Sequence, residues 1–159
     1  MSNRINSDQI VEHAWKYFEI HSNQRITLFN YFLFIMTGLG AGIGISLQAS
    51  VKFAYVGVFI SFFVILVSFI FWKLDQRTSF LIKESEKVLI FLERNSPVDV
   101  GIFSKEEVNL DRQNKDKFYF LKTMTYGEIF RFTFFVTGSV GIGGIIIFVL
   151  KIFKYISLK

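Results

Sequence analysis

Few side chains in this sequence are of the types that do chemistry, and their spacing argues against catalysis and metal binding. The chain has no cysteine, so thiolate nucleophiles and thiolate metal sites are excluded. Its two histidines, His13 and His21, are eight residues apart, which is about 80° around a helix, and no third ligand is fixed beside them. The chain also carries no G-x-S-x-G motif. We therefore expect no catalytic residue, no metal, no cofactor and no enzyme activity.

Basic and aromatic residues interleave just before the last apolar stretch of the chain. Such a mixture can hold a nucleotide or a single strand, because the charges meet phosphates and the rings stack on bases. The ligand-binding candidates are Arg112, Lys115, Lys117, Tyr119 and Lys122. Their position favours a second interpretation, in which the lysines contact lipid phosphates and the rings lie at headgroup depth. The sequence alone leaves both interpretations open.

Three uncharged apolar stretches must position these residues. They span 26–50, 53–72 and 132–150, and each approaches or exceeds the ~20 residues that a helix needs to cross a bilayer core. The composition, 52% hydrophobic with 21 Phe, exceeds what a soluble chain of this length could bury. Because only a short link at Lys52 separates the first two stretches, they predict an antiparallel hairpin.

We expect an all-α integral membrane protein built from four segments. They are a cytoplasmic amphipathic helix at 1–25, a transmembrane helix hairpin at 26–72, a cytoplasmic helical segment at 73–125, and a third transmembrane helix with its tail at 126–159. The amphipathic helix is indicated by apolar residues at i, i+3, i+4 and i+7, namely Val11, Ala14, Trp15 and Phe18.

The second apolar stretch is followed by charged residues without a helix breaker, so one helix is expected to run from the membrane into the cytoplasm. Glu84 and Lys87 form an i, i+3 pair of opposite charge on that helix. Residues 95–97 should end it, Ser104 with Glu107 matches a capping box, and 111–117 is predicted to be a polar loop. The predicted inner face of the helix holds Leu81, Ser85, Val88, Leu89 and Leu92.

The distribution of basic residues predicts the orientation. Three Lys or Arg precede the first stretch, ten lie from Lys73 to Lys122, Arg131 adjoins the third stretch, and Lys52 stands alone in the link. The positive-inside rule then places the N-terminus and the 73–125 segment in the cytoplasm and the link outside. If the third stretch also crosses the membrane, the C-terminal lysines lie outside, which is a mild violation of that rule. The alternative is that the third stretch folds back without crossing. We favour crossing. Nine acidic residues offset the ten basic ones of 73–125, so its net charge of +1 does not indicate a nucleic-acid binder.

Small residues recur in the first and third stretches at spacings that let two helix backbones approach closely. These predicted packing residues are Gly38, Gly40, Gly42, Gly44, Gly138, Gly141 and Gly144. These glycines can serve packing between helices of one chain or contact between subunits. If they serve contact between subunits, the protein is expected to be a homo-oligomer.

A polar and small stripe runs along one face of the first stretch, at spacings of seven, four, three and four residues. The pore-lining candidates are Asn30, Thr37, Ala41, Gly44 and Gln48. Such a stripe can line a water path in an assembly, or it can supply hydrogen bonds between helices. No acid or base lies within the apolar stretches, which argues against a proton-coupled transporter.

Charged residues at the end of the second stretch could act as a switch. The gating candidates are Arg25, Lys73, Asp75 and Arg77. Arg25, with its neighbours Asn23 and Gln24, begins the first stretch and could pair with Asp75 across the hairpin to hold a closed state. Anchoring of Lys73 and Arg77 at lipid phosphates is the alternative.

Three sequence patterns carry a resemblance to a known family. They are HSNQR at 21–25, LFNYF at 28–32 and KLDQRTSFLIK at 73–83, the last followed by Glu86. They resemble the SLATT type of small membrane effector from bacterial anti-phage operons, and the channel subunit of the Hailong system is a similar protein. The resemblance covers about residues 10–95 and, more weakly, 126–144.

This resemblance implies a pore-forming effector of abortive infection in the bacterial inner membrane. It would depolarise the cell when a partner's signal, such as a nucleotide or oligonucleotide, arrives. The implied operon partner is a nucleotidyltransferase or a reverse transcriptase. The alternative function is a non-conducting membrane anchor or sensor that scaffolds a cytoplasmic partner.

Overall fold

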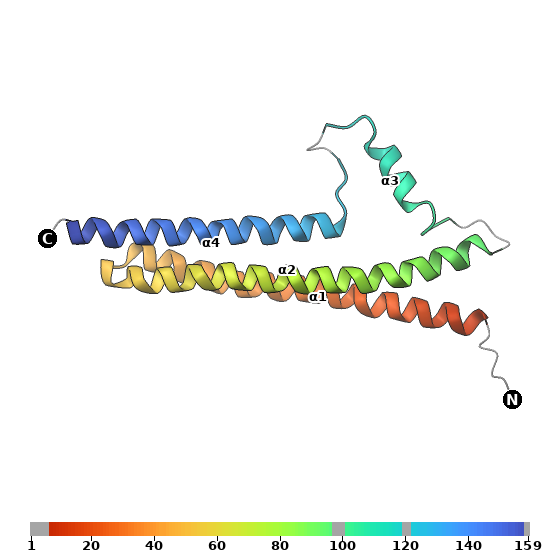
Figure 1. The fold of residues 1–159 in the computed structure, drawn as a ribbon, viewed down its shortest axis with the longest axis horizontal. Helices are drawn as coiled ribbons and strands as arrows, with labels where there is room; N and C mark the ends of the chain where they lie inside the picture. The colour runs from red at the N-terminus through yellow and green to blue at the C-terminus, as the bar shows by residue number, and fades with distance from the viewer. Residues whose placement is uncertain (1–6, 97–100, 119–121, 158–159) are drawn as a thin grey trace. The chain divides into compact units, whose positions relative to one another are not determined.

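The structure is a computed structural model, and it describes residues 7–96, 101–118 and 122–157 of the chain (Figure 1). Every regular element in these ranges is helical, as predicted. The elements are α1 (Ser7–Gln48), the short 3-10 helix η1 (Val51–Phe53), α2 (Ala54–Arg94), α3 (Glu106–Asn114) and α4 (Tyr126–Ser157). Three of them, α1, α2 and α4, are long and apolar enough to cross a membrane.

Both long helices at the start of the chain are unbroken. α1 has 42 residues and runs through the predicted amphipathic segment into the first apolar stretch. α2 has 41 residues and continues through Asp75 to Arg94, which confirms the predicted continuity of this helix. The turn between them is tight, because the backbone N–H of Phe53 donates to the Ser50 carbonyl at 2.9 Å.

The chain divides into two compact units. The apolar unit is Ile26–Asp75 with Gly127–Lys159, and the polar unit is Met1–Arg25 with Gln76–Tyr126. In the apolar unit α4 lies beside the hairpin of α1 and α2 (Figure 1). The placement of the four predicted segments in membrane and cytoplasm stays a prediction.

Aromatic rings join the three helices of the apolar unit. Phe29 of α1 stacks on Phe130 of α4 with ring centroids 4.0 Å apart, and Phe32 meets Phe134 edge to face at 4.7 Å. Phe32, Phe130 and Phe134 are buried, and Phe71 of α2 packs against them. Offset and edge-to-face ring pairs are the favoured aromatic geometries, so this cluster fixes α4 against both arms of the hairpin.

Buried residues recur along α2 at alternating spacings of three and four, with one gap of seven between Ser68 and Asp75. They are Ala54, Gly57, Ser61, Val64, Ser68, Asp75, Thr78, Ile82, Ser85 and Leu89. This spacing is that of a coiled-coil seam, in which the inner residues of a helix face its neighbours at every turn. Most of these residues are small, so neighbouring backbones can approach closely.

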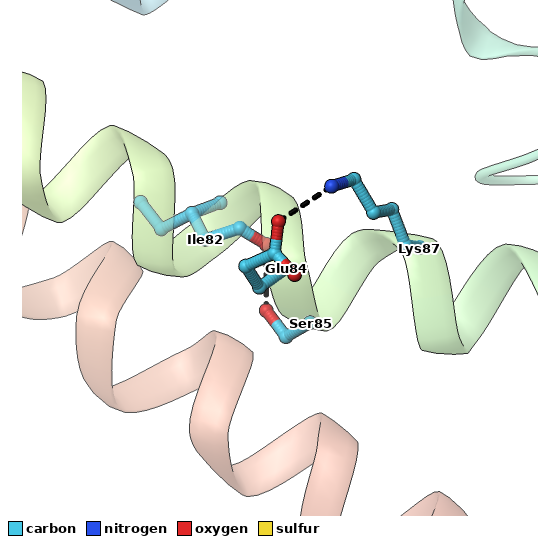
Figure 2. Close-up of polar contacts among 4 residues, drawn as sticks. All are labelled: Ile82, Glu84, Ser85 and Lys87. Atoms are coloured by element: carbon cyan, nitrogen blue, oxygen red, sulfur yellow. Dashed lines mark hydrogen bonds and ion pairs between the residues drawn. The ribbon is translucent and has the colours of Figure 1, made fainter.

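The inner face predicted for the charged part of α2 was partly wrong. Ser85 and Leu89 are buried, but Val88 is exposed and Ile82 is buried in its place. Leu81 and Leu92 are half-buried. Figure 2 shows this turn: the Ser85 hydroxyl donates to the Ile82 carbonyl at 2.7 Å, while Lys87 pairs with Glu84 on the exposed side, as predicted.

The chain after α2 differs from its prediction in two places. α3 begins at Glu106 with Lys105 at its N-cap position, not at Ser104, and it runs to Asn114 through half of the predicted loop. Ser104 lies before the N-cap position, and its backbone N–H donates to a carboxylate oxygen of Glu93 at 2.7 Å rather than taking part in the predicted capping box. The end of α3 is held by Asn114, whose side-chain oxygen accepts from the Thr123 N–H at 2.8 Å.

Candidate functional site

The predicted packing glycines fall into two groups, and the first packs within the chain. A Cβ atom at Gly141 would stand 2.8 Å from Cγ1 of Ile65 and 2.9 Å from the Ser61 carbonyl oxygen. A Cβ atom at Gly144 would stand 3.2 Å from Cβ of Ser61. Gly138 and Gly42 also have neighbours on α2, at 3.6 and 3.0 Å. The glycines of α4 therefore allow α4 to lie against α2.

The second group faces away from the described chain. A Cβ atom at Gly38, Gly40 or Gly44 would meet no other atom within 4 Å. These glycines of α1 are not needed for the packing of their own chain, so they are available to a neighbouring molecule.

Gly57 is a packing glycine that the sequence analysis missed. The ring of Phe148, which is fully buried, occupies the place where a Cβ atom at position 57 would stand. Gly57 lies at the start of the α2 seam, three residues after Ala54 and four before Ser61, so its 3–4 spacing was the signal that could have found it.

A second missed residue is Lys151 of α4. Its ammonium donates to the carbonyl oxygens of Leu47 and Ala49, both at 2.8 Å, and to that of Ser46 at 3.5 Å. These carbonyls end α1, where the last four C=O groups lack helical partners and the helix dipole is negative. Lys151 therefore caps α1 from the far end of α4.

The five pore-lining candidates share one face of α1, and that face is largely open. Asn30, Thr37, Ala41 and Gln48 are exposed and Gly44 is half-buried. The Thr37 hydroxyl donates to the Leu33 carbonyl at 2.9 Å, so it is satisfied within its own helix. Their role as a pore lining stays a prediction.

The four gating candidates differ in their surroundings. Asp75 is buried, with 5% of its surface exposed, whereas Arg77 is exposed and Arg25 is half-buried. The ammonium of Lys73 lies 4.6 Å from the Trp72 ring centroid, which is a cation–π contact. The latch between Asp75 and residues 23–25 stays a prediction.

Arg25 acts on a carboxylate of the polar unit. Burial raises the pKa of Glu86, and the negative charge of Glu106 raises it further, while Lys83 and Arg25 act in the opposite direction. Glu86 thus lies among charges from α1, α2 and α3, which makes it sensitive to the arrangement of those helices.

The ligand-binding candidates are dispersed. Arg112 lies on the last turn of α3, and Lys115, Lys117 and Lys122 are exposed. Tyr119 lies outside the described residues. Whether these side chains bind a ligand or a lipid surface stays a prediction. In the described ranges no group of three or more His, Asp or Glu could hold a metal ion.

A cavity of about 370 Å³ in the polar unit gathers two basic side chains, one carboxylate and two hydroxyls that were not among the sequence-predicted site residues. It is lined by Glu93, Arg94, Ser96, Ser104 and Lys105. The last turn of α2 supplies the first two residues and the turn before α3 supplies the last two. The two pairs are ten residues apart in the sequence, so no motif search would have grouped them.

Glu93 holds that turn in place. Its two carboxylate oxygens accept the backbone N–H groups of Ile102 and Ser104. Gly101 precedes them with a φ of 64°, a left-handed conformation that favours glycine. Desolvation acts to raise the pKa of Glu93, but hydrogen bonds from Ser104, Ile102 and Phe103 outweigh it and leave the pKa below its usual range.

The fold defines an all-α protein with three helices long and apolar enough to cross a membrane. Over 135 residues the chain is 42% identical to CD-NTase-associated protein 19 of Escherichia coli, in an alignment covering 82% of this chain and 85% of that protein. The chain belongs to the family of CD-NTase-associated protein 19. No family model and no solved structure matches it. The relative's name does not test the SLATT-type resemblance, which stays a prediction.

Proposed function

We propose that this protein is a membrane effector of an anti-phage defence system that depolarises the cell on a signal made by a nucleotidyltransferase partner. The observation that carries the proposal is the kinship with a protein named for its association with a CD-NTase, a nucleotidyltransferase. Three helices of membrane-crossing length and composition support action at the membrane. On this proposal the protein is not an enzyme.

The proposed topology follows the basic residues. The N-terminus and the charged part of α2 lie in the cytoplasm of a bacterial cell, with Lys52 outside and α4 crossing. Cysteines placed singly at Ser50, Ser96 and Ser157 test this with an impermeant thiol reagent, because the natural chain has none. Labelling at Ser50 and Ser157 is expected in intact cells, and labelling at Ser96 contradicts the orientation.

A homo-oligomer would form the pore. Gly38, Gly40 and Gly44 face open space on α1, and so do most residues of the polar stripe. Polar side chains facing lipid are costly, whereas small and polar residues together favour contact between helices. Assembly through α1 would remove the open glycines and the polar stripe from contact with lipid and would place the stripe along a water path.

The positively charged cavity is the proposed receiver of the signal. Arg94 and Lys105 would pair with phosphate oxygens, for which charge-assisted hydrogen bonds are the strong kind. Ser96 and Ser104 add hydroxyls to the same wall. Because Arg94 is the last residue of α2, a ligand there would act on the end of a helix that is unbroken back to Ala54.

The test is expression with the native nucleotidyltransferase in cells carrying a membrane-potential dye. Depolarisation on infection, absent when the nucleotidyltransferase is catalytically inactive, is the expected result. A potential that never changes, although the partner becomes membrane-bound only when this protein is present, would instead support the non-conducting anchor.

A further inference from the structure

The apolar unit contains a groove between α2 and α4 that its own side chains do not fill. It has a volume of about 350 Å³ and its wall includes Ser68, Phe69, Trp72, Arg131, Phe135 and Ile142. Phe69, Phe135 and Ile142 are each more than half exposed, so the groove opens to the surface of the unit. We call it the α2–α4 groove.

One end of the α2–α4 groove is polar and positively charged. Arg131 of α4 lies there, and its Nε donates to the Gly127 carbonyl at 2.9 Å, which fixes the guanidinium on its own helix. No acid pairs with Arg131 among the residues that the structure describes. Trp72 of α2 lies at the same end, with the Lys73 ammonium 4.6 Å from its ring centroid.

Apart from Ser68 and Ser139, the rest of the groove wall is apolar, and it has about the length of one bilayer leaflet. From Arg131 to Ile142 is eleven residues of α4, or about 16 Å of helix. A bilayer core is ~30 Å thick, so this is about half of it. A cation and a Trp at one end of an apolar path of that length fit a headgroup followed by an acyl chain.

We propose that the α2–α4 groove binds an anionic phospholipid, with one acyl chain in the groove and the phosphate on Arg131. The proposal rests on the membrane location proposed above and does not depend on the pore. Ser68 lies on the groove wall about one turn deeper than Trp72, where its exposed fraction of 4% leaves the wall closed behind the apolar side chains.

Charge complementarity selects lipid over a helix from a second copy. A helix seated in the groove would cover Arg131 with apolar side chains and withdraw its charge from water, which is costly without a paired anion. A phospholipid brings that anion and an apolar chain in one molecule.

Trp72 provides the readout, because it lies in the groove and Trp15 is the one other tryptophan. Substitution Trp15→Phe keeps a ring beside Phe18 and Phe103 and leaves Trp72 as the sole emitter. The protein is reconstituted in phosphatidylcholine vesicles containing equal fractions of brominated phosphatidylglycerol or brominated phosphatidylcholine. We expect the brominated anionic lipid to quench Trp72 more strongly at every fraction.

Three variants in that background locate the effect. Arg131→Gln is expected to lower the preference for the anionic lipid about fivefold. Lys154→Gln, which removes one charge near the other end of α4, is expected to leave it unchanged. Gly138→Leu places a large side chain on the groove wall, where a Cβ atom would meet only Ser68, at 3.6 Å. Because this side chain would occupy the groove in place of an acyl chain, we expect less quenching by both lipids.

Equal quenching by the two lipids, unaltered by Arg131→Gln, would mean ordinary lipid contact and would overturn the proposal. Weak quenching by both in protein that floats with the vesicles would mean that a protein segment fills the groove. Protein that stays outside the vesicles, with native helicity by circular dichroism, would refute the membrane location itself. Failure of the pore shows separately, in the membrane-potential assay.

Discussion

The ring of Phe148 lies against the backbone of Gly57, in the place that any larger side chain at position 57 would need. Phe148 is fully buried and Gly57 is buried, so neither can move aside into solvent or lipid. This contact holds the far half of α4 against the start of α2, as the phenylalanine cluster around Phe32 holds its near half.

We expect Gly57→Ala to destabilise the apolar unit by about 1–3 kcal/mol, the usual cost of overpacking. The added methyl group collides with the Phe148 ring. The measurement is the thermal unfolding midpoint in mild detergent. Gly40→Ala is the matched control, because its Cβ atom would meet nothing within 4 Å and Ala favours helix. Equal midpoints for the two variants would contradict the contact; partial recovery in Gly57→Ala with Phe148→Leu would support it.

Open glycines and packed glycines should separate assembly from folding. Gly40→Leu is expected to weaken cross-linked oligomers in mild detergent without lowering the unfolding midpoint, because a Cβ atom at position 40 would meet no other atom within 4 Å. Gly141→Leu is expected to lower the midpoint, because Ile65 and the Ser61 carbonyl already occupy the space. A wild-type protein that is monomeric in both detergent and lipid would remove the oligomer and the pore with it.

Replacing Lys151 should loosen the end of α1. In Lys151→Met the ammonium that caps Leu47 and Ala49 is lost, and a cap of this kind contributes about 1 kcal/mol. Hydrogen exchange of the amides around the turn at 49–53 is expected to speed up, with little change near Phe32. Lys154→Met, one turn later on α4, is the control. Unchanged exchange at the turn would show that Lys151 does not hold it.

The helices and their continuity could be predicted from the sequence, but the faces they use could not. Uncharged stretches of about 20 residues and a missing breaker after Trp72 suffice to predict α1, α2 and α4. Which glycine packs depends on how each helix is rotated about its axis: Gly141 meets α2, whereas Gly40 meets nothing. The rotation of α2 about its axis was likewise not predictable, so Val88 was assigned to the inner face although Ile82 is the buried residue.

The candidate sites were less predictable because they join distant parts of the chain. Lys151 reaches carbonyls more than 100 residues away, which no local pattern encodes. The cavity beside Glu93 needs a turn that returns Ser104 to the end of α2, and a left-handed Gly101 makes that turn possible.

Acid should stabilise the polar unit through Glu86. Its pKa lies above the ordinary value of 4.5, chiefly because of burial and then because of Glu106. The folded state therefore binds this proton more tightly, so stability rises as pH falls through the raised pKa and levels off below 4.5. Glu86→Gln is expected to flatten this part of the profile and to raise the unfolding midpoint at neutral pH. A profile identical to that of the wild type would contradict the assignment.

The two possible receivers of the signal, one from sequence and one from structure, give opposite expectations for matched charge removals. Arg94→Gln with Lys105→Gln removes two positive charges from the cavity at the end of α2, while Arg112→Gln with Lys115→Gln removes two from exposed positions at the end of α3. Because charge-assisted contacts to phosphate are strong and local, the first pair should abolish depolarisation in cells with the native nucleotidyltransferase, and the second should preserve it. Membrane fractionation and oligomer cross-linking must remain normal in both pairs, so that a lost response is not a lost protein. The reverse pattern would assign the signal to the residues before α4. If both double variants still depolarise the cell, neither site binds the nucleotide, and depolarisation would then depend on direct contact with the partner.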